Sequence, residues 1–291
     1  MNTPPRPEHQ PDAPASAPDT AATPAPDAQV PDTGEQLNPE QPDAGQPDAE
    51  QSAVDKFVAS KIDPSGKPEL LPDGLFDHMR ADPARAPEYL ALAAVERFGP
   101  DAQQWIAEVR SQFPNITDEN LASITRRRFV RLSSYSGAVA GVAGGVGAVV
   151  DFGVLAWNQA QMVIYLATIF GEDPGSRDRA AELLMLQDVH KVMDTAQTAL
   201  DVAARRKNPT ELLKHSSRVS ESKGSLGTLA VTLAKMVGMK LAKRGFMKLI
   251  PLASVPLGAI ANARSTGDLA DRAISMYRYR KYYYRPQLPP S

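Results

Sequence analysis

The chain has no cysteine among its 291 residues, which excludes disulfides, thiol nucleophiles and zinc or iron–sulfur sites held by cysteine. Aromatic residues are also scarce, at 6% of the chain. The first residues, MNTPPRPEHQ, lack a basic stretch followed by an apolar one, so we expect no secretory signal peptide and a cytoplasmic location. These absences remove thiol-dependent enzymes and cysteine metalloproteins from consideration.

Residues 1–50 lack the material for a core. They contain 12 of the 26 prolines, ten acidic residues, a single base (Arg6) and no aromatic residue, for a local net charge of −9. Such a segment cannot bury enough apolar surface to offset the ~1–2 kcal/mol per residue that ordering its backbone costs. We therefore predict a disordered acidic tail over 1–50, and we also expect the last residues, 286–291, to be disordered.

The remaining residues are basic although the whole chain is not. The chain carries a net charge of −2, but beyond residue 50 it has 31 bases and 24 acids, a net charge of +7. Two interpretations stay open. The acidic tail could act as a solubilising arm, or the folded part could prefer anionic partners with which the tail competes.

Beyond the tail, apolar residues recur at steps of three and four, and no segment alternates at period two. This pattern predicts an all-α helical bundle, with short helices in a transitional segment over 51–84. Gly99-Pro100 is expected to separate two helices, because glycine and proline commonly follow a helix end. The predicted helices include 87–98, 101–113, 177–206 and one that begins near residue 268.

A long stretch in the middle of the chain is nearly free of charge. From Ser133 to Gly171 the one charged residue is Asp151. We predict a central Gly-rich apolar helical hairpin over 137–170, preceded in the chain by the disordered tail. Three glycines four residues apart, Gly137, Gly141 and Gly145, would leave one helix face flat. Each costs ~1 kcal/mol of helix stability relative to alanine, so the hairpin needs either a packed protein interior or a membrane.

Asp151 within this stretch has two possible roles. It could cap a helix that begins near Phe152. Alternatively it could be a buried carboxylate paired with Asn262 or with a lysine of the 235–248 group, since an unpaired buried charge is costly. A phosphate-binding loop is disfavoured, because Gly147 is followed by Ala-Val-Val-Asp rather than by Lys-Ser or Lys-Thr.

Two runs resemble the signature of the EcsC family. The first, GGVGAVVDFGVLAWNQAQMVIYLATIFGED, has a glycine-rich run, an aspartate, an apolar helix and a closing Phe170-Gly171 pair followed by an acid. The second, IPLASVPLGAIANARSTGDLADRAISMYRYR, has a proline–glycine stretch, Asn262, Ala273 and Tyr277. The resemblance covers roughly residues 85–285. It implies a bacterial helical domain of a family named after a member encoded beside an ABC transporter, with no accepted enzymatic activity or cofactor.

Basic residues gather in two places that could contact an anionic surface. The candidates are Lys235, Lys240, Lys243, Arg244 and Lys248 on one predicted helix, and Arg278, Arg280 and Lys281 among the C-terminal tyrosines. For the tyrosine cluster three interpretations stay open. The rings could pack on the bundle, lie at a membrane interface, or stack on nucleic acid, which is the least favoured.

These features together predict a non-catalytic, EcsC-like helical protein at the cytoplasmic face of a membrane, acting as an accessory of the membrane or of a transporter. The expected partner is a membrane surface or a membrane protein. The alternatives are a soluble helical protein-interaction module with a protein partner, and an unrecognised hydrolase. The sequence indicates no catalytic residue, metal ligand, cofactor or small-molecule ligand.

Overall fold

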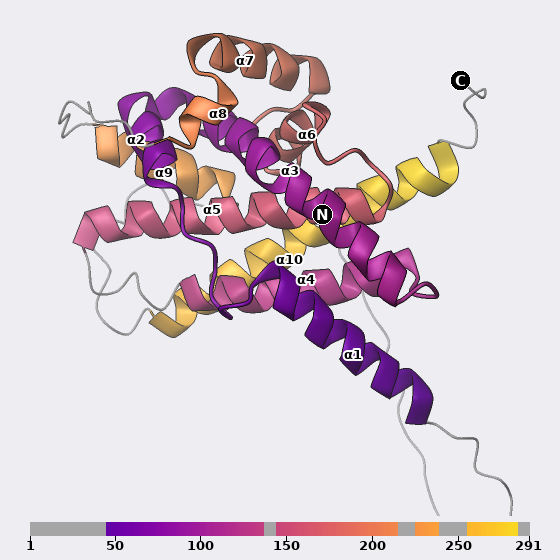
Figure 1. Ribbon diagram of the computed structural model, residues 1–291. Helices are drawn as coiled ribbons and strands as arrows, with labels where there is room; N and C mark the ends of the chain where they lie inside the picture. The colour runs from indigo at the N-terminus through magenta and orange to yellow at the C-terminus, as the bar shows by residue number, and fades with distance from the viewer. Residues whose placement is uncertain (1–44, 137–143, 215–224, 239–254, 285–291) are drawn as a thin grey trace, which may run out of the picture. The chain divides into compact units, whose positions relative to one another are not determined.

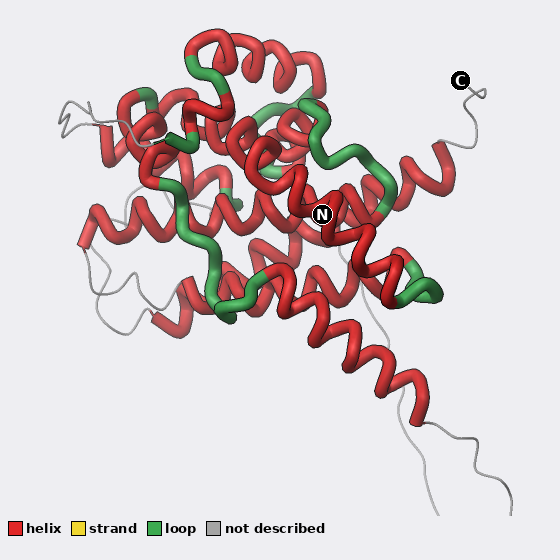
Figure 2. The backbone as a smooth tube through the Cα atoms, viewed as in Figure 1, coloured by secondary structure: helices red, strands yellow, loops and turns green. Residues whose placement is uncertain are grey.

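Every regular element that the structure describes is helical, which confirms the predicted all-α bundle (Figure 2). The structure is a computed structural model, and it describes residues 45–136, 144–214, 225–238 and 255–284. All of these residues belong to one unit that begins at Gly45. The first helix also begins at Gly45, within the segment predicted as a tail, while 1–44 and 285–291 lie outside the described residues.

The described part of the chain contains ten α-helices and two short helical turns (Figure 1). Their bounds are α1 Gly45–Ile62, α2 Asp73–Ala81, η1 Pro83–Arg85, α3 Ala86–Gln112, α4 Asp118–Ser136, α5 Gly144–Ile169, α6 Asp178–Leu186, α7 Met193–Arg206, α8 Pro209–Leu212, α9 Ser225–Met236, α10 Val255–Tyr279 and η3 Arg280–Tyr284.

Helix α5 is the centre of the packing. It contacts α3, α4, α9 and α10, and Figure 1 shows it running between α3 on one side and α4 and α10 on the other. Every residue from 153 to 170 is buried, as in a helix that other elements cover on all sides. Two of its aromatic rings pack against rings of α3. The ring centroids of Trp157 in α5 and Phe98 in α3 lie 4.7 Å apart, and those of Tyr165 in α5 and Trp105 in α3 lie 4.9 Å apart.

The predicted division of this stretch into two hairpin arms is wrong, because residues 144–169 form one continuous helix. The role of Asp151 as a helix cap is therefore also wrong, since α5 begins seven residues earlier, at Gly144. Gly145 lies in the first turn of α5, and Gly137 and Gly141 lie outside the described residues. None of the described helices combines the length and the apolar character needed to cross a bilayer.

Helix α3 continues through Gly99-Pro100, which were expected to separate two helices. The proline removes one backbone donor, but the packing of this helix against α5 and α6 outweighs the loss. Gly99 instead allows the backbone of Pro174 and Gly175 to approach α3 closely. A Cβ atom at this position would lie 3.1 Å from the carbonyl oxygen of Pro174 and 3.3 Å from Cα of Gly175.

The helix predicted over 177–206 is two helices, α6 and α7. The chain leaves α6 at Asp188, which takes a positive φ of 57°. The backbone N–H groups of Val189 and His190 both donate hydrogen bonds to the carbonyl oxygen of Leu184, at 2.9 and 3.3 Å. These bonds give a partner to a carbonyl group at the C-terminal end of α6. The apolar spacing continues across this break, so periodicity alone did not reveal it.

The last helix is longer than expected, because α10 begins at Val255 rather than near residue 268. It packs along α4, from which Arg126 donates two hydrogen bonds to Asp271 of α10, at 2.7 and 2.9 Å. Deeper in the interface, Thr266 donates a hydrogen bond of 2.8 Å to Ser133. These contacts fix α10, and they determine where its C-terminal end lies.

Candidate functional site at the tyrosine end of helix α10

The helix α10 ends in a turn of a different kind. After Tyr279 the backbone continues as a π-helical turn, Arg280–Tyr284. Such turns are rare, and they often occur at functional sites. The turn carries most of the tyrosine cluster that the sequence analysis singled out.

Four of these tyrosines are exposed, and they form what we call the tyrosine surface. The exposed fractions are 61% for Tyr279, 43% for Tyr282, 61% for Tyr283 and 53% for Tyr284. By contrast, Tyr277 is fully buried. Of the three open interpretations, packing of alternate rings on the bundle holds for Tyr277, while the other four rings are exposed. Exposed apolar area gathered in one place is typical of an interaction site.

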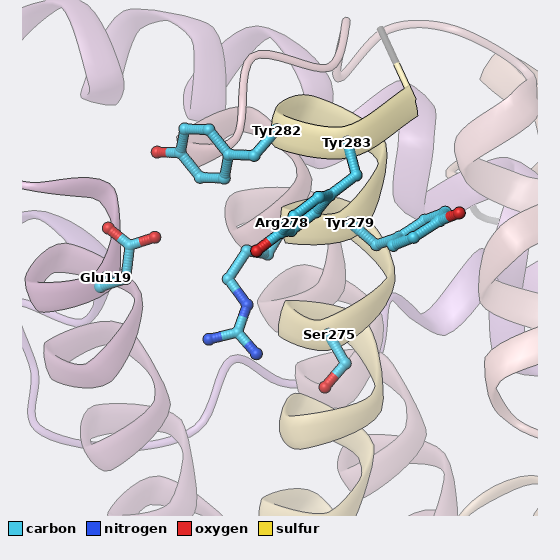
Figure 3. Close-up of a pocket in the computed structure, with 6 residues that line it drawn as sticks. All are labelled: Glu119, Ser275, Arg278, Tyr279, Tyr282 and Tyr283. Atoms are coloured by element: carbon cyan, nitrogen blue, oxygen red, sulfur yellow. The ribbon is translucent and has the colours of Figure 1, made fainter. Parts of the chain in front are cut away.

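A hollow of about 340 Å³ lies beside this surface (Figure 3). Its lining residues are Glu119 of α4 and Ser275, Arg278, Tyr279, Tyr282 and Tyr283 of α10 and the π-helical turn. Figure 3 shows Arg278 of α10 and Tyr282 of the π-helical turn extending toward the side on which Glu119 lies. Tyr279 and Tyr283 stack on each other, with their ring centroids 5.7 Å apart.

Asp118, at the start of α4, holds the π-helical turn in place. The hydroxyl of Tyr282 donates a hydrogen bond of 2.6 Å to its carboxylate, and Lys281 and Arg110 form ion pairs with the same group. Burial alone would raise the pKa of Asp118, but hydrogen bonds from Lys281, Tyr282 and Arg110 outweigh it and lower the pKa below its ordinary value. The same hydrogen bond raises the pKa of Tyr282 to about 12.

A buried ionic network fixes the other side of the turn. Glu182 of α6 binds Arg179 at 2.9 Å and Arg280 at 2.5 Å, and it accepts a 3.0 Å hydrogen bond from the hydroxyl of Tyr277. Glu172 lies 3.4 Å from Arg179 and 3.6 Å from Arg280. Two arginines and two glutamates thus neutralise each other inside the protein. Burial raises the pKa of the Glu182 carboxyl even though the arginines favour its charged form.

The network joins the two runs on which the family resemblance rests. Glu172 follows Phe170-Gly171 at the end of the first run, and Gly171 supplies the positive φ of 81° that the turn requires. Tyr277 and Arg280 come from the second run. The sequence analysis missed Arg179 and Glu182, and the available signal was an acid and a base three residues apart in an otherwise apolar part of the helix.

The predicted anionic-surface contacts divide into three groups. Arg278 and Lys235 are exposed, and no ion pair engages them within the described residues. Arg280 and Lys281 are bound to acidic side chains of the chain itself. The remaining four, Lys240, Lys243, Arg244 and Lys248, lie outside the described residues. Their contacts with a partner stay predictions.

Asp151 is half-buried on α5, away from the tyrosine surface. Within the described part of the chain its Oδ2 atom is buried and has no hydrogen-bond partner. Asn262 is buried on α10, and no described hydrogen bond joins the two side chains. Burial raises the pKa of Asp151 from 3.8 to about 6. The lysines proposed as alternative partners lie mostly outside the described residues.

Replacing Asp151 with asparagine should raise the free energy of unfolding by about 2 kcal/mol at pH 8 and have little effect at pH 4. The folded state holds the proton up to about pH 6, while the unfolded chain loses it near 3.8, so the folded wild type binds more protons between these values. The wild type therefore loses stability as the pH rises through this window, and the asparagine variant does not. Urea unfolding at both pH values tests this. A variant less stable than the wild type at pH 8 would instead indicate a cation beside Asp151.

A metal centre finds no support among the described residues, which contain no group of three or more His, Asp or Glu side chains arranged to hold an ion.

The fold and the tyrosine surface together define a class of protein. It is a helical bundle whose surface at the end of α10 is aromatic, with exposed Glu119 and Arg278 beside the rings. The model of the EcsC protein family matches residues 112–281, more than half of the chain, and the chain belongs to this family. The resemblance seen in the sequence is thereby confirmed.

The matched region runs from the last residue of α3 into the π-helical turn, so the buried network falls within it, whereas Tyr279 is the one member of the tyrosine surface that it includes. Comparisons with curated proteins and with solved structures found no match to this chain.

Proposed function

We propose that this EcsC-family protein acts without catalysis at the cytoplasmic face of a membrane, as an accessory of the membrane or of a transporter. The tyrosine surface makes the contact. The observation that carries the proposal is the gathering of four exposed tyrosines beside the exposed Arg278 at one end of α10.

The chemistry of this surface suits the boundary between lipid and water. Tyrosine rings are amphipathic and are enriched at headgroup depth, where the ring is partly buried and the hydroxyl stays hydrated. A cation placed there gains ~1 kcal/mol from anionic lipid. Because Arg280 and Lys281 are neutralised within the protein, the rings supply the larger part of the interaction and Arg278 a smaller part.

Flotation of the full chain with vesicles tests the proposal. The protein should float with vesicles containing phosphatidylglycerol, and replacing Tyr279 and Tyr283 together with serine should weaken the binding about tenfold, the equivalent of ~1.4 kcal/mol. Tyr135→Ser is the matched control, since Tyr135 is 56% exposed and lies 17 residues, about 26 Å along α4, from Asp118, which binds the π-helical turn.

Failure to float with any vesicle, at low or high salt, would overturn the membrane proposal. The second candidate would then be a protein-interaction module that uses the same surface, because tyrosine and arginine are enriched at the centres of protein interfaces. A hydrolase finds less support, since the hollow holds one carboxylate and no histidine.

A further inference from the structure

The hollow beside the tyrosine surface presents two opposite charges. Glu119 comes from α4 and Arg278 from α10, both are exposed, and within the described residues neither belongs to an ion pair. A purely anionic ligand would be repelled by Glu119, and a purely cationic one by Arg278. A ligand that carries both charges, a few ångströms apart, would be attracted by both side chains.

The walls of the hollow are aromatic. Tyr279, Tyr282 and Tyr283 line it, and ammonium groups bind to the faces of such rings within about 6 Å of the centroid. Tyr282 already makes one contact of this kind, with Nζ of Lys281 at 5.5 Å from its ring centroid. The hollow therefore offers a cation aromatic faces as well as the carboxylate of Glu119.

These walls are held in place before any ligand arrives. The hydroxyl of Tyr282 is fixed by Asp118, and Tyr283 is stacked on Tyr279. The wider π-helical turn directs these side chains to their positions. Such preorganisation lowers the entropic cost of binding, because these side chains do not have to be ordered when the ligand arrives. A volume of about 340 Å³ is at the small end of ligand sites, which suits a headgroup better than a large cofactor.

We propose that the hollow binds the zwitterionic headgroup of a phospholipid, with the ammonium between the tyrosine rings and Glu119 and the phosphate on Arg278. This inference rests on the proposed function and makes it more specific. The protein would then contact the membrane through the tyrosine surface and recognise one chemical class of lipid within it.

The test holds the anionic lipid constant and changes the neutral one. The full chain is floated with vesicles of 30% phosphatidylglycerol, in which the remainder is either phosphatidylethanolamine mixed with phosphatidylcholine or an uncharged galactolipid. We expect about fivefold more protein bound to the zwitterionic vesicles. Glu119→Gln and Arg278→Gln should each abolish this difference.

Two matched controls should keep the difference. Asp194→Asn changes an exposed acid in the first turn of α7, as Glu119 is in the first turn of α4. Arg205→Gln changes an exposed base in the last turn of α7, as Arg278 is in the last turn of α10. Circular dichroism of all four variants checks that they are folded.

The outcomes separate the two proposals. Equal flotation with both vesicle types, or a preference that survives Glu119→Gln, would overturn the headgroup site and leave the membrane role standing. Absence of flotation with either type would overturn the membrane role. Titration with glycerophosphoethanolamine distinguishes the source of the ligand in that case, since binding that Glu119→Gln removes would show a site for a free zwitterion, and no binding would reject the site as well.

Discussion

Replacing Glu182 with alanine should lower the free energy of unfolding by about 3–5 kcal/mol, the usual effect of removing one partner from a buried ion pair. Arg179 has a side chain only 4% exposed and would keep Glu172 alone as a counterion. Arg280 and the hydroxyl of Tyr277 would lose their closest acceptor. Thermal unfolding should show a decrease in Tm of roughly 6–20 °C for a domain of this size.

The exposed Glu211 on α8 provides the control, since Glu211→Ala should change stability by about 0.5 kcal/mol or less. Hydrogen exchange adds a local measurement. The amides of the π-helical turn should exchange faster in Glu182→Ala, because the turn is fixed on this side through Arg280. A loss of less than about 1 kcal/mol would show that the network contributes little to stability.

The second large effect is expected at Asn158, in the middle of α5. Its side chain accepts a hydrogen bond from the backbone N–H of Glu69 at 3.0 Å and donates one to the carbonyl oxygen of the same residue at 2.9 Å. Asn158→Ala would leave both backbone groups without these partners in a partly buried place, at a cost of about 2–4 kcal/mol. Urea unfolding of the variant measures the loss.

Asn120→Ala, at an exposed position of α4, is the matched control and should be nearly neutral. The connection between α1 and α2 gives a further measurement, because Asn158 ties this segment to α5. Its amides should exchange faster in Asn158→Ala than in the wild type. Unchanged exchange together with unchanged stability would contradict the role assigned to this side chain.

Periodicity predicted the fold class and the presence of most helices, but not their limits. Gly99-Pro100 carries a strong local signal for a helix end, and α3 nevertheless continues through it because α5 and α6 pack along its length. Asp188 carries no comparable signal, and the chain leaves α6 there. Both errors have the same origin. Tertiary contacts decide where a helix ends, even against local preferences of ~1 kcal/mol for glycine and ~3 kcal/mol for proline.

The candidate site was predicted in composition but not in arrangement. Helical spacing could not place Tyr282, Tyr283 and Tyr284, because α10 gives way to a π-helical turn at Arg280 and the side-chain directions change with it. The ion pairs of Arg280 and Lys281 join residues 98 and 163 positions apart. No local pattern reports such pairs, so bases that looked free in the sequence turned out to be engaged.

The long sequence separation within the buried network has a consequence for biosynthesis. A ribosome makes Glu172, Arg179 and Glu182 about a hundred residues before Arg280. Until the end of α10 emerges, this part of the nascent chain carries an excess negative charge and lacks the helix that covers α4 and α5. Contacts between distant segments also form slowly. We therefore expect translation to run ahead of folding, so that chains stopped before residue 277 are the ones that proteases and chaperones recognise.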